Sequence, residues 1–157
     1  MATEQQIPKL VASPVEQASY PGWVMKHFTS DLETEISTGI ESPQLWLHDR
    51  QKAGKSITGN KIYAFLLPDQ ETYRAKEGDL IWQCVSLADI QFYEKYPHRI
   101  PLEWKGKLIY AWKSVVLDGY GYRDVPCLNC AVRRPCVRWF RLDCGWGDGG
   151  PACFSAS

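Results

Sequence analysis

The chain contains no apolar run long enough to cross a lipid bilayer, so we expect no transmembrane helix and no membrane partner. Its first residues lack both the basic patch and the apolar stretch of a signal peptide. Net charge is also absent, because 18 basic residues balance 18 acidic ones, whereas proteins that bind nucleic-acid phosphates usually carry a basic excess. We therefore predict a cytoplasmic protein, or one within a virion assembled in the cytoplasm.

Catalytic motifs are equally scarce. The three histidines are scattered, and the chain has neither a Gly-x-Ser-x-Gly elbow nor an H-E-x-x-H motif. The tripeptide from Glu103 to Lys105 resembles the E-x-K motif of PD-(D/E)xK nucleases, which would need a carboxylate such as Asp79 to share a magnesium ion. An ordinary pair of surface charges explains the same tripeptide. The sequence therefore leans against an enzyme, with Glu103 and Lys105 as the only catalytic candidates.

Cysteine is nearly absent before residue 120, where only Cys84 occurs, but five cysteines follow. A chain of this length can bury a core without disulfides, and clustered cysteines in a reducing compartment are more often metal ligands. The C-x2-C spacing lets two thiolates meet one metal ion. We predict a thiolate site for zinc or a [4Fe-4S] cluster, with disulfides and free thiols as alternatives. Its expected ligands are Cys127, Cys130, Cys136 and Cys144, with Cys84 or Cys153 as a substitute.

Two short stretches near the carboxyl end resemble a known family. The run from Cys127 to Cys136, followed by Gly145-Trp146-Gly147-Asp148-Gly149, is similar to the paired motifs of WhiB-type iron–sulfur regulators. The likeness covers about two dozen residues, Ala131 replaces the usual proline, and the first 120 residues do not share it. The resemblance implies a cluster whose fourth ligand lies upstream, which nominates Cys84.

Arginines alternate with aromatic residues in the same segment. Such side chains can stack on bases and pair with phosphates, and the same mixture is common at the centre of protein–protein interfaces. We therefore predict that this segment contacts other protein subunits or, alternatively, nucleic acid. The predicted contact residues are Arg133, Arg134, Arg138, Trp139 and Arg141.

The hydrophobic content of 45% predicts a packed core, and the pattern favours an α+β fold. We expect a small, mostly antiparallel sheet of four or five strands with two short helices. Residues 1–22, with three prolines, read as an extended arm, residues 23–120 as the α+β core and residues 121–157 as an irregular, Cys-rich knob. Strands are expected at 44–48, 61–67, 79–85 and 107–116, and helices at 30–40 and 86–96.

The leading functional prediction is a non-enzymatic assembly or interaction protein, such as a structural subunit of a viral (phage) particle or of another large complex. The neutral, aromatic-rich composition and the lack of a catalytic set both favour it. A zinc or iron–sulfur accessory or regulatory protein that binds nucleic acid is the alternative. A PD-(D/E)xK-like nuclease is a third.

Overall fold

The structure, a computed structural model, describes residues 18–29 and 39–155. These residues form the mixed α/β fold that the sequence predicts, with helices α1 (Gly59–Leu66) and α2 (Leu87–Lys95). The strands are β1 (Val24–His27), β2 (Pro43–Trp46), β3 (Ile57–Thr58), β4 (Leu108–Tyr110), β5 (Val116–Asp118), β6 (Arg123–Asn129), β7 (Cys136–Arg141), β8 (Gly145–Trp146) and β9 (Ala152–Ser155). Short 3-10 helices connect them: η2 (Asp49–Gln51), η3 (Leu80–Gln83), η4 (Pro97–Arg99), η5 (Leu102–Trp104) and η6 (Trp112–Ser114). No helix in the described ranges is long and apolar enough to cross a membrane.

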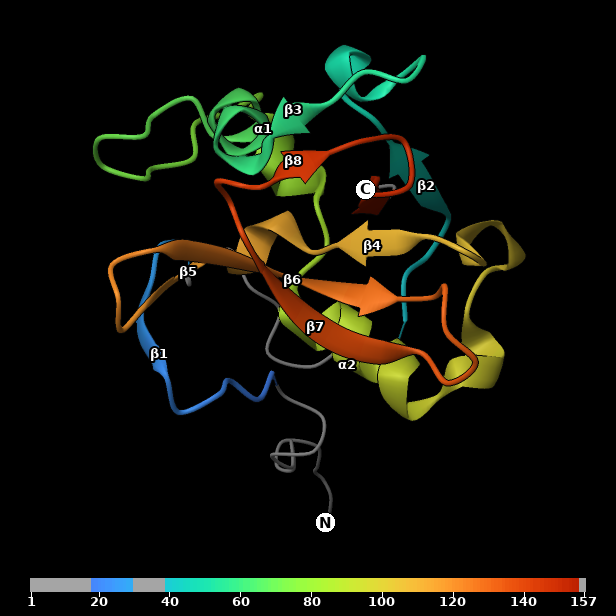
Figure 1. Cartoon of the computed structure of the whole chain (residues 1–157). Coiled ribbons are helices and arrows are strands. Elements are labelled where there is room, and N and C mark those ends of the chain that lie inside the picture. The colour runs from blue at the N-terminus through green and yellow to red at the C-terminus, as the bar shows by residue number, and fades with distance from the viewer. Residues whose placement is uncertain (1–17, 30–38, 156–157) are drawn as a thin grey trace, which may run out of the picture.

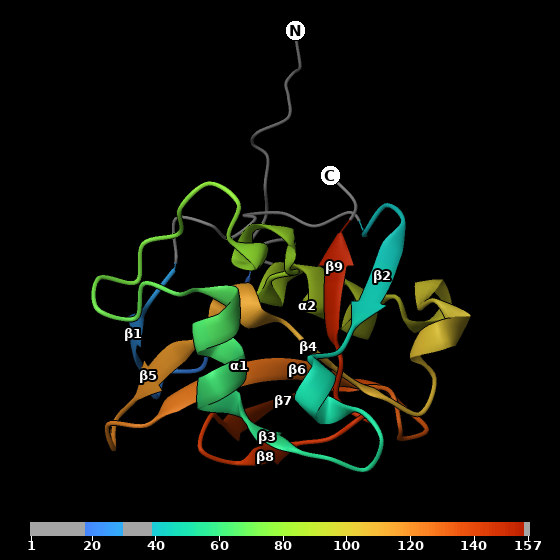
Figure 2. The same cartoon turned by 90° about the horizontal axis from the view of Figure 1, so that it is seen from above.

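Strand β6 is the centre of a seven-stranded sheet. It pairs with β7 on one side, and with β5 and then β4 on the other, so that Cys127 lies between Tyr110 of β4 and Arg138 of β7. Beyond β5 lies β1, whereas β9 and β2 run side by side beyond β4 (Figures 1 and 2). Among the described strands of this sheet, only β4 and β9 pair in parallel. Strands β7, β1 and β2 are therefore its edges, and β3 pairs separately with β8.

The two helices cover opposite faces of β6. Val125 and Cys127 point into a core cluster that contains the buried side of α1, whereas Leu128 and Cys130 point into a cluster that contains Ile90 and the rest of the buried side of α2. This division follows from the alternation of side chains along a strand. The sheet is thus buried on both faces over the middle of β6.

Helix α1 corrects the strand expected at residues 61–67. Ile62, Tyr63 and Leu66 are buried at helical spacing, while Phe65 is half-exposed on the other side. Because an apolar residue also occupies the exposed side, the segment reads as a strand that is buried on both faces. Helical period and burial together identify the actual element.

Two other expected strands are also interrupted. Residues 79–85 form η3 instead, and Cys84 makes only an isolated bridge with Phe154. Residues 107–116 divide into β4, η6 and the start of β5, and Trp112 and Ser114 of η6 are both buried in the core. The Ser114 hydroxyl accepts a hydrogen bond of 2.7 Å from the Leu87 amide at the start of α2.

Two local predictions are confirmed. Helix α2 begins after Ser86 and ends before Pro97, as predicted, and its start is a capping box in which Ser86 and Asp89 bond to each other's backbone. Strand β2 overlaps the strand expected at 44–48. The helix expected at 30–40 lies almost wholly outside the described residues.

The segment after residue 120 corrects the irregular knob expected there. It supplies β6, β7, β8 and β9, and it gives the sheet seven strands rather than four or five. Gln51 holds the glycine-rich loop between β8 and β9, because its buried amide donates 3.0 Å hydrogen bonds to the Gly147 and Gly150 carbonyls. The cysteines of this segment therefore lie within or next to regular strands.

Candidate functional site

A pocket of about 520 Å³ is lined by residues in and next to β1, in the β5–β6 turn and at the end of β7. Figure 1 shows where these elements lie in the fold. We call it the aromatic pocket. Its lining residues are Trp23, Met25, Asp118, Gly119, Tyr120, Asp124, Trp139 and Arg141. Several of its large apolar side chains face solvent: Trp23 is 40% exposed, Met25 68% and Tyr120 85%. Exposed apolar side chains gathered around one concavity are typical of a contact site.

The β5–β6 turn positions the exposed tyrosines of the pocket rim. The Asp118 carboxylate accepts hydrogen bonds from the amides of Tyr120, at 2.8 Å, and Tyr122, at 3.0 Å. Gly121 has a φ of 86°, a left-handed conformation that other residues rarely adopt. The turn is thus rigid, and it presents Tyr120 toward solvent beside β1.

Two carboxyl groups lie together at this end of the sheet. Asp124 is only 6% exposed, and burial, followed by its hydrogen bond to Asp118 and the charge of Asp118, raises the pKa of Asp124 to about 7. Burial alone would raise the pKa of Asp118, but hydrogen bonds from the Tyr122 amide, from Asp124 and from the Tyr120 amide lower it. The two aspartates therefore share a proton, with Asp124 as its usual holder.

Arg141 and Trp139 form the β7 side of the pocket. Arg141 is the cross-strand partner of Asp124, and its guanidinium carbon lies 3.9 Å from the centre of the Tyr122 ring. The Trp139 ring meets Trp23 edge to face, with 5.2 Å between ring centres. Two of the contact residues predicted from the sequence therefore lie in one pocket with aromatic residues from β1 and from the β5–β6 turn.

The described end of the predicted arm packs beside this pocket. The Ser19 amide donates to the Gln91 side chain of α2 at 2.9 Å, and the same side chain donates back to the Ser19 carbonyl at 2.9 Å. The Tyr20 ring lies 4.1 Å from the His27 ring and 6.2 Å from Trp139, measured between ring centres. The rest of the arm, residues 1–17, lies outside the described residues.

Replacing Gln91 with alanine is expected to loosen residues 18–27. The change removes both hydrogen bonds to Ser19, which are solvent-exposed and together contribute about 1 kcal/mol. Trypsin should then cut after Lys26 roughly fivefold faster, because cleavage follows the population of the opened state. Mass spectrometry of a timed digest measures the rate. Gln83→Ala, at an exposed position outside this contact, is the control, and equal rates for both variants would contradict the contact.

The predicted thiolate ligands are not gathered around one centre. Cys127 and Cys130 belong to core clusters on opposite faces of β6, and Cys144 is exposed after β7. All six cysteines are free thiols, and no group of three or more His, Cys, Asp or Glu residues within the described ranges could hold a metal ion. This arrangement does not fit zinc or a cluster at the predicted ligands. The thiolate site stays a prediction that would require a different packing of this segment.

Thiol alkylation distinguishes the free thiols of this structure from a thiolate site that binds a metal or a cluster. Burial raises the pKa of Cys127 and Cys153 to about 12, so both remain neutral and unreactive at pH 8. We expect iodoacetamide to modify exposed Cys144 first and half-buried Cys136 next, with Cys84, Cys127 and Cys153 modified only after unfolding. Peptide mass spectrometry reads the order. Joint protection of all four predicted ligands, lost on adding a chelator, would instead support the thiolate site.

The remaining predicted arginine contacts do not join the pocket. Arg133 and Arg134 are exposed in the β6–β7 turn, at the far end of β7 from Arg141. Arg138 is exposed on the other face of β7, because it alternates with Trp139 along the strand. The predicted set is thus spread over both faces and both ends of β7, and nucleic-acid binding by the whole set stays a prediction.

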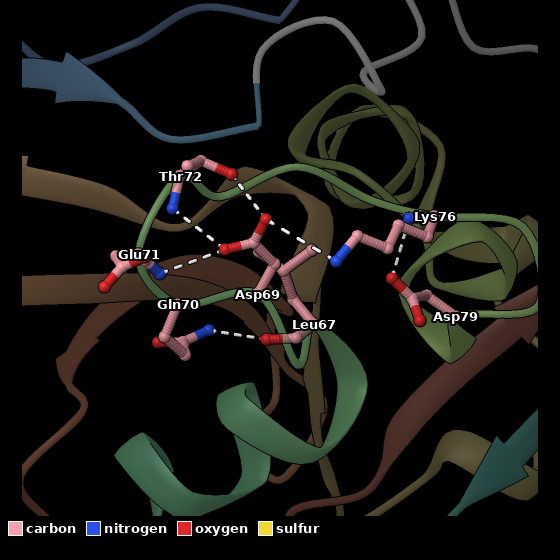
Figure 3. A network of polar contacts seen from close by, with 7 residues as sticks. All are labelled: Leu67, Asp69, Gln70, Glu71, Thr72, Lys76 and Asp79. Carbon is pink, nitrogen blue, oxygen red and sulfur yellow. Dashed lines mark hydrogen bonds and ion pairs between the residues drawn. The ribbon is translucent and has the colours of Figure 1, made fainter.

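The nuclease candidates lie apart from one another. Glu103 and Lys105 are at and just beyond η5, whereas Asp79 precedes η3. Figure 3 shows that the Asp79 carboxylate accepts a 2.7 Å hydrogen bond from the Lys76 amide, so it closes a loop. In the same loop Asp69 accepts bonds from Thr72 and Glu71. Glu103 and Asp79 line separate pockets, so these residues do not form a shared magnesium site in this arrangement.

Sequence reasoning missed the residues that complete the aromatic pocket, namely Trp23, Met25, Asp118, Tyr120 and Asp124. The run Asp118-Gly-Tyr-Gly-Tyr122 was the available signal, because alternating glycines after a strand indicate a tight hairpin turn. Such a turn places Asp118 close to Asp124. No protein-family model, no curated protein and no solved structure matches this chain.

Proposed function

We propose that the protein is a non-enzymatic interaction protein, a subunit of a larger assembly, and that the aromatic pocket binds an extended segment of a partner protein. The observation that carries the proposal is the gathering of Trp23, Met25 and Tyr120, all exposed, around a pocket that also contains Trp139 and Arg141. Tryptophan, tyrosine and arginine are the residues that most often dominate the free energy of protein–protein binding.

The outer edge of β7 around Trp139 supports an extended partner rather than a compact one. Val137 donates its outward N–H to Glu94 of α2 at 2.8 Å, and because backbone N–H and C=O groups alternate in direction along a strand, those of Trp139 and Arg141 point to the same outer edge. The Arg141 carbonyl accepts a 3.3 Å hydrogen bond from the Cys144 amide, whereas no described residue bonds to the outward backbone groups of Trp139. An added strand would pair with Trp139, and its alternate side chains would enter the pocket.

A peptide library tests this proposal directly. Random peptides are selected on the full-length protein, and the dissociation constants of the enriched peptides are measured by fluorescence anisotropy. Tyr120→Ala should weaken binding at least tenfold, because it removes an exposed aromatic anchor without disturbing the core. Met25→Ala should weaken it about threefold.

Leu102→Ala is the matched control, because Leu102 is 83% exposed but lies in η5, away from the pocket. Its affinity for the peptides should equal that of the unchanged protein. The proposal is overturned if no peptide is enriched, or if the enriched peptides bind Tyr120→Ala and Met25→Ala as tightly as they bind Leu102→Ala.

A further inference from the structure

We propose that the aromatic pocket receives a basic side chain, lysine or arginine, from the partner segment, with Asp118 and Asp124 as its counter-charges. This inference rests on the proposed function and specifies the chemistry of the partner. It follows from the charge inside the pocket and from the aromatic rings that surround that charge.

The pocket holds more negative than positive charge when both aspartates are ionised. Asp118 and Asp124 then carry two negative charges against the single positive charge of Arg141. No described residue forms an ion pair with either carboxylate, although the charge of Arg141 attracts both. One additional cation would balance the pocket, whereas a phosphate or carboxylate would face two like charges against one arginine.

Asp124 is more than an exposed acidic residue near an opening. Only 6% of Asp124 is exposed, yet the residue lines the pocket. Its carboxyl group is hydrogen-bonded to the carboxyl group of Asp118. Arg141 attracts this carboxylate but does not hold the pKa of Asp124 at its usual value, so the site gains free energy when a second cation arrives. Asp124 thus provides a buried carboxyl group among the aromatic residues that line the pocket.

The walls suit a cation as well. Trp23, Tyr120 and Trp139 line the pocket, and the π-faces of tryptophan and tyrosine attract ammonium and guanidinium groups. The chain already shows this chemistry at the pocket rim, where Arg141 lies over Tyr122. The aliphatic part of a lysine or arginine side chain would pack against Met25, which is 68% exposed.

Binding of the cation should depend on pH, because the shared proton must leave before both aspartates are charged. The charged groups that act on Asp124 are Asp118 on β5, Arg141 on β7 and Asp143 just beyond β7. The pKa of Asp118 is held below its usual value by the hydrogen bonds that it accepts, so Asp118 stays ionised over this range. The change in affinity between pH 5.5 and pH 8 therefore reports mainly on Asp124.

The experiment uses n-butylammonium, a mimic of the lysine side chain, and n-pentanol, a neutral molecule of similar length. Each is titrated into the full-length protein while the tryptophan indole signals are followed by NMR. We expect n-butylammonium to shift the Trp23 and Trp139 signals saturably, about tenfold more tightly at pH 8 than at pH 5.5. Asp124→Asn should bind weakly at both pH values, and Asp49→Asn, at an exposed carboxylate remote from the pocket, should behave as the unchanged protein.

The inference is overturned if n-pentanol binds as well as n-butylammonium, or if Asp124→Asn leaves the affinity and its pH dependence unchanged. The results that would refute the cation proposal differ from those that would refute the proposed interaction function. Selected peptides that lose affinity on Tyr120→Ala but contain no recurrent lysine or arginine would refute the cation and keep the interaction site. Binding of n-butylammonium without any peptide binding would refute the interaction function and keep the cation pocket.

Discussion

Replacing Trp112 with alanine is expected to lower the free energy of unfolding by about 3–5 kcal/mol. The side chain is 1% exposed, and its ring centre lies 5.7 Å from that of Trp146 and 6.1 Å from that of Tyr63. It therefore joins α1, β8 and the centre of the sheet in one aromatic cluster. The deletion removes these contacts and leaves a cavity that the rigid sheet cannot close. Urea unfolding followed by circular dichroism measures the change.

Trp82→Ala is the control for this prediction. Trp82 is 49% exposed, and its side chain makes one described hydrogen bond, from the indole N–H to the Lys76 carbonyl at 3.1 Å. We expect this variant to lose less than about 1 kcal/mol. Because many domains have only 5–15 kcal/mol of stability, Trp112→Phe provides a milder variant with an expected loss of about 1–2 kcal/mol. Equal losses at Trp82 and Trp112 would show that the aromatic cluster is not the core.

Trp112 also explains why the sequence predicts the sheet only in part. The residues around it alternate as a strand would, yet the chain turns through η6, where Trp112 and Ser114 are both buried. That turn is favourable only because Ser114 bonds to the start of α2 and because Trp112 fits against Trp146, which is 34 residues further along the chain. Local alternation contains no information about either contact.

Elements with local determinants were predictable. Helix α2 has its capping box at one end and Pro97 at the other, and both signals lie within the segment itself. Helix α1 has no side-chain cap at Thr58, and its exposed Phe65 hides the helical period. Its position depends on Gly59, where a Cβ atom would lie 2.5 Å from the Trp146 ring. Helix α1 is therefore defined by tertiary packing, which periodicity alone does not reveal.

The aromatic pocket also combines residues that local sequence patterns indicate with residues that only strand pairing brings together. Trp139 and Arg141, which line the pocket, were already candidates from the sequence, because the mixture of arginine and aromatic residues in β7 is local. The pairing of Asp118 with Asp124 needs the register of the β5–β6 hairpin, and Trp23 needs the pairing of β1 with β5. The cysteines illustrate the converse, since Cys127 and Cys130 are neighbours in sequence but lie on opposite faces of β6.

Replacing Asp124 with asparagine is expected to stabilise the protein above pH 7, which few substitutions at buried polar residues do. The folded protein holds the Asp124 proton up to a pH of about 7, whereas the unfolded chain releases it near 3.8. Between these values the folded state binds more protons, so the free energy of unfolding falls as the pH rises. Asparagine does not ionise, and its side-chain N–H can still donate to Asp118. The free energy of unfolding of Asp124→Asn should therefore not fall in this way as the pH rises.

The size of the effect follows from the two pKa values. A pKa of about 7 against an ordinary value of 3.8 sets an upper limit of about 4 kcal/mol, and solvent screening at the open pocket reduces it to about 2 kcal/mol. Urea unfolding of both proteins should therefore give similar stabilities at pH 4 and a growing advantage for Asp124→Asn up to pH 8. Asp49→Asn, at an exposed position, should follow the unchanged protein at every pH.

The same measurement bears on why the chain keeps an aspartate at this position. If Asp124→Asn is more stable at pH 8 and also loses n-butylammonium, then the unfavourable buried charge is retained for binding, since stability alone would favour asparagine. Because the variant is expected to be folded and more stable, its loss of affinity cannot be attributed to unfolding. Equal or lower stability of Asp124→Asn at pH 8 would mean that a described partner already compensates the charge, and the pocket would then have no unbalanced carboxylate to offer a cation.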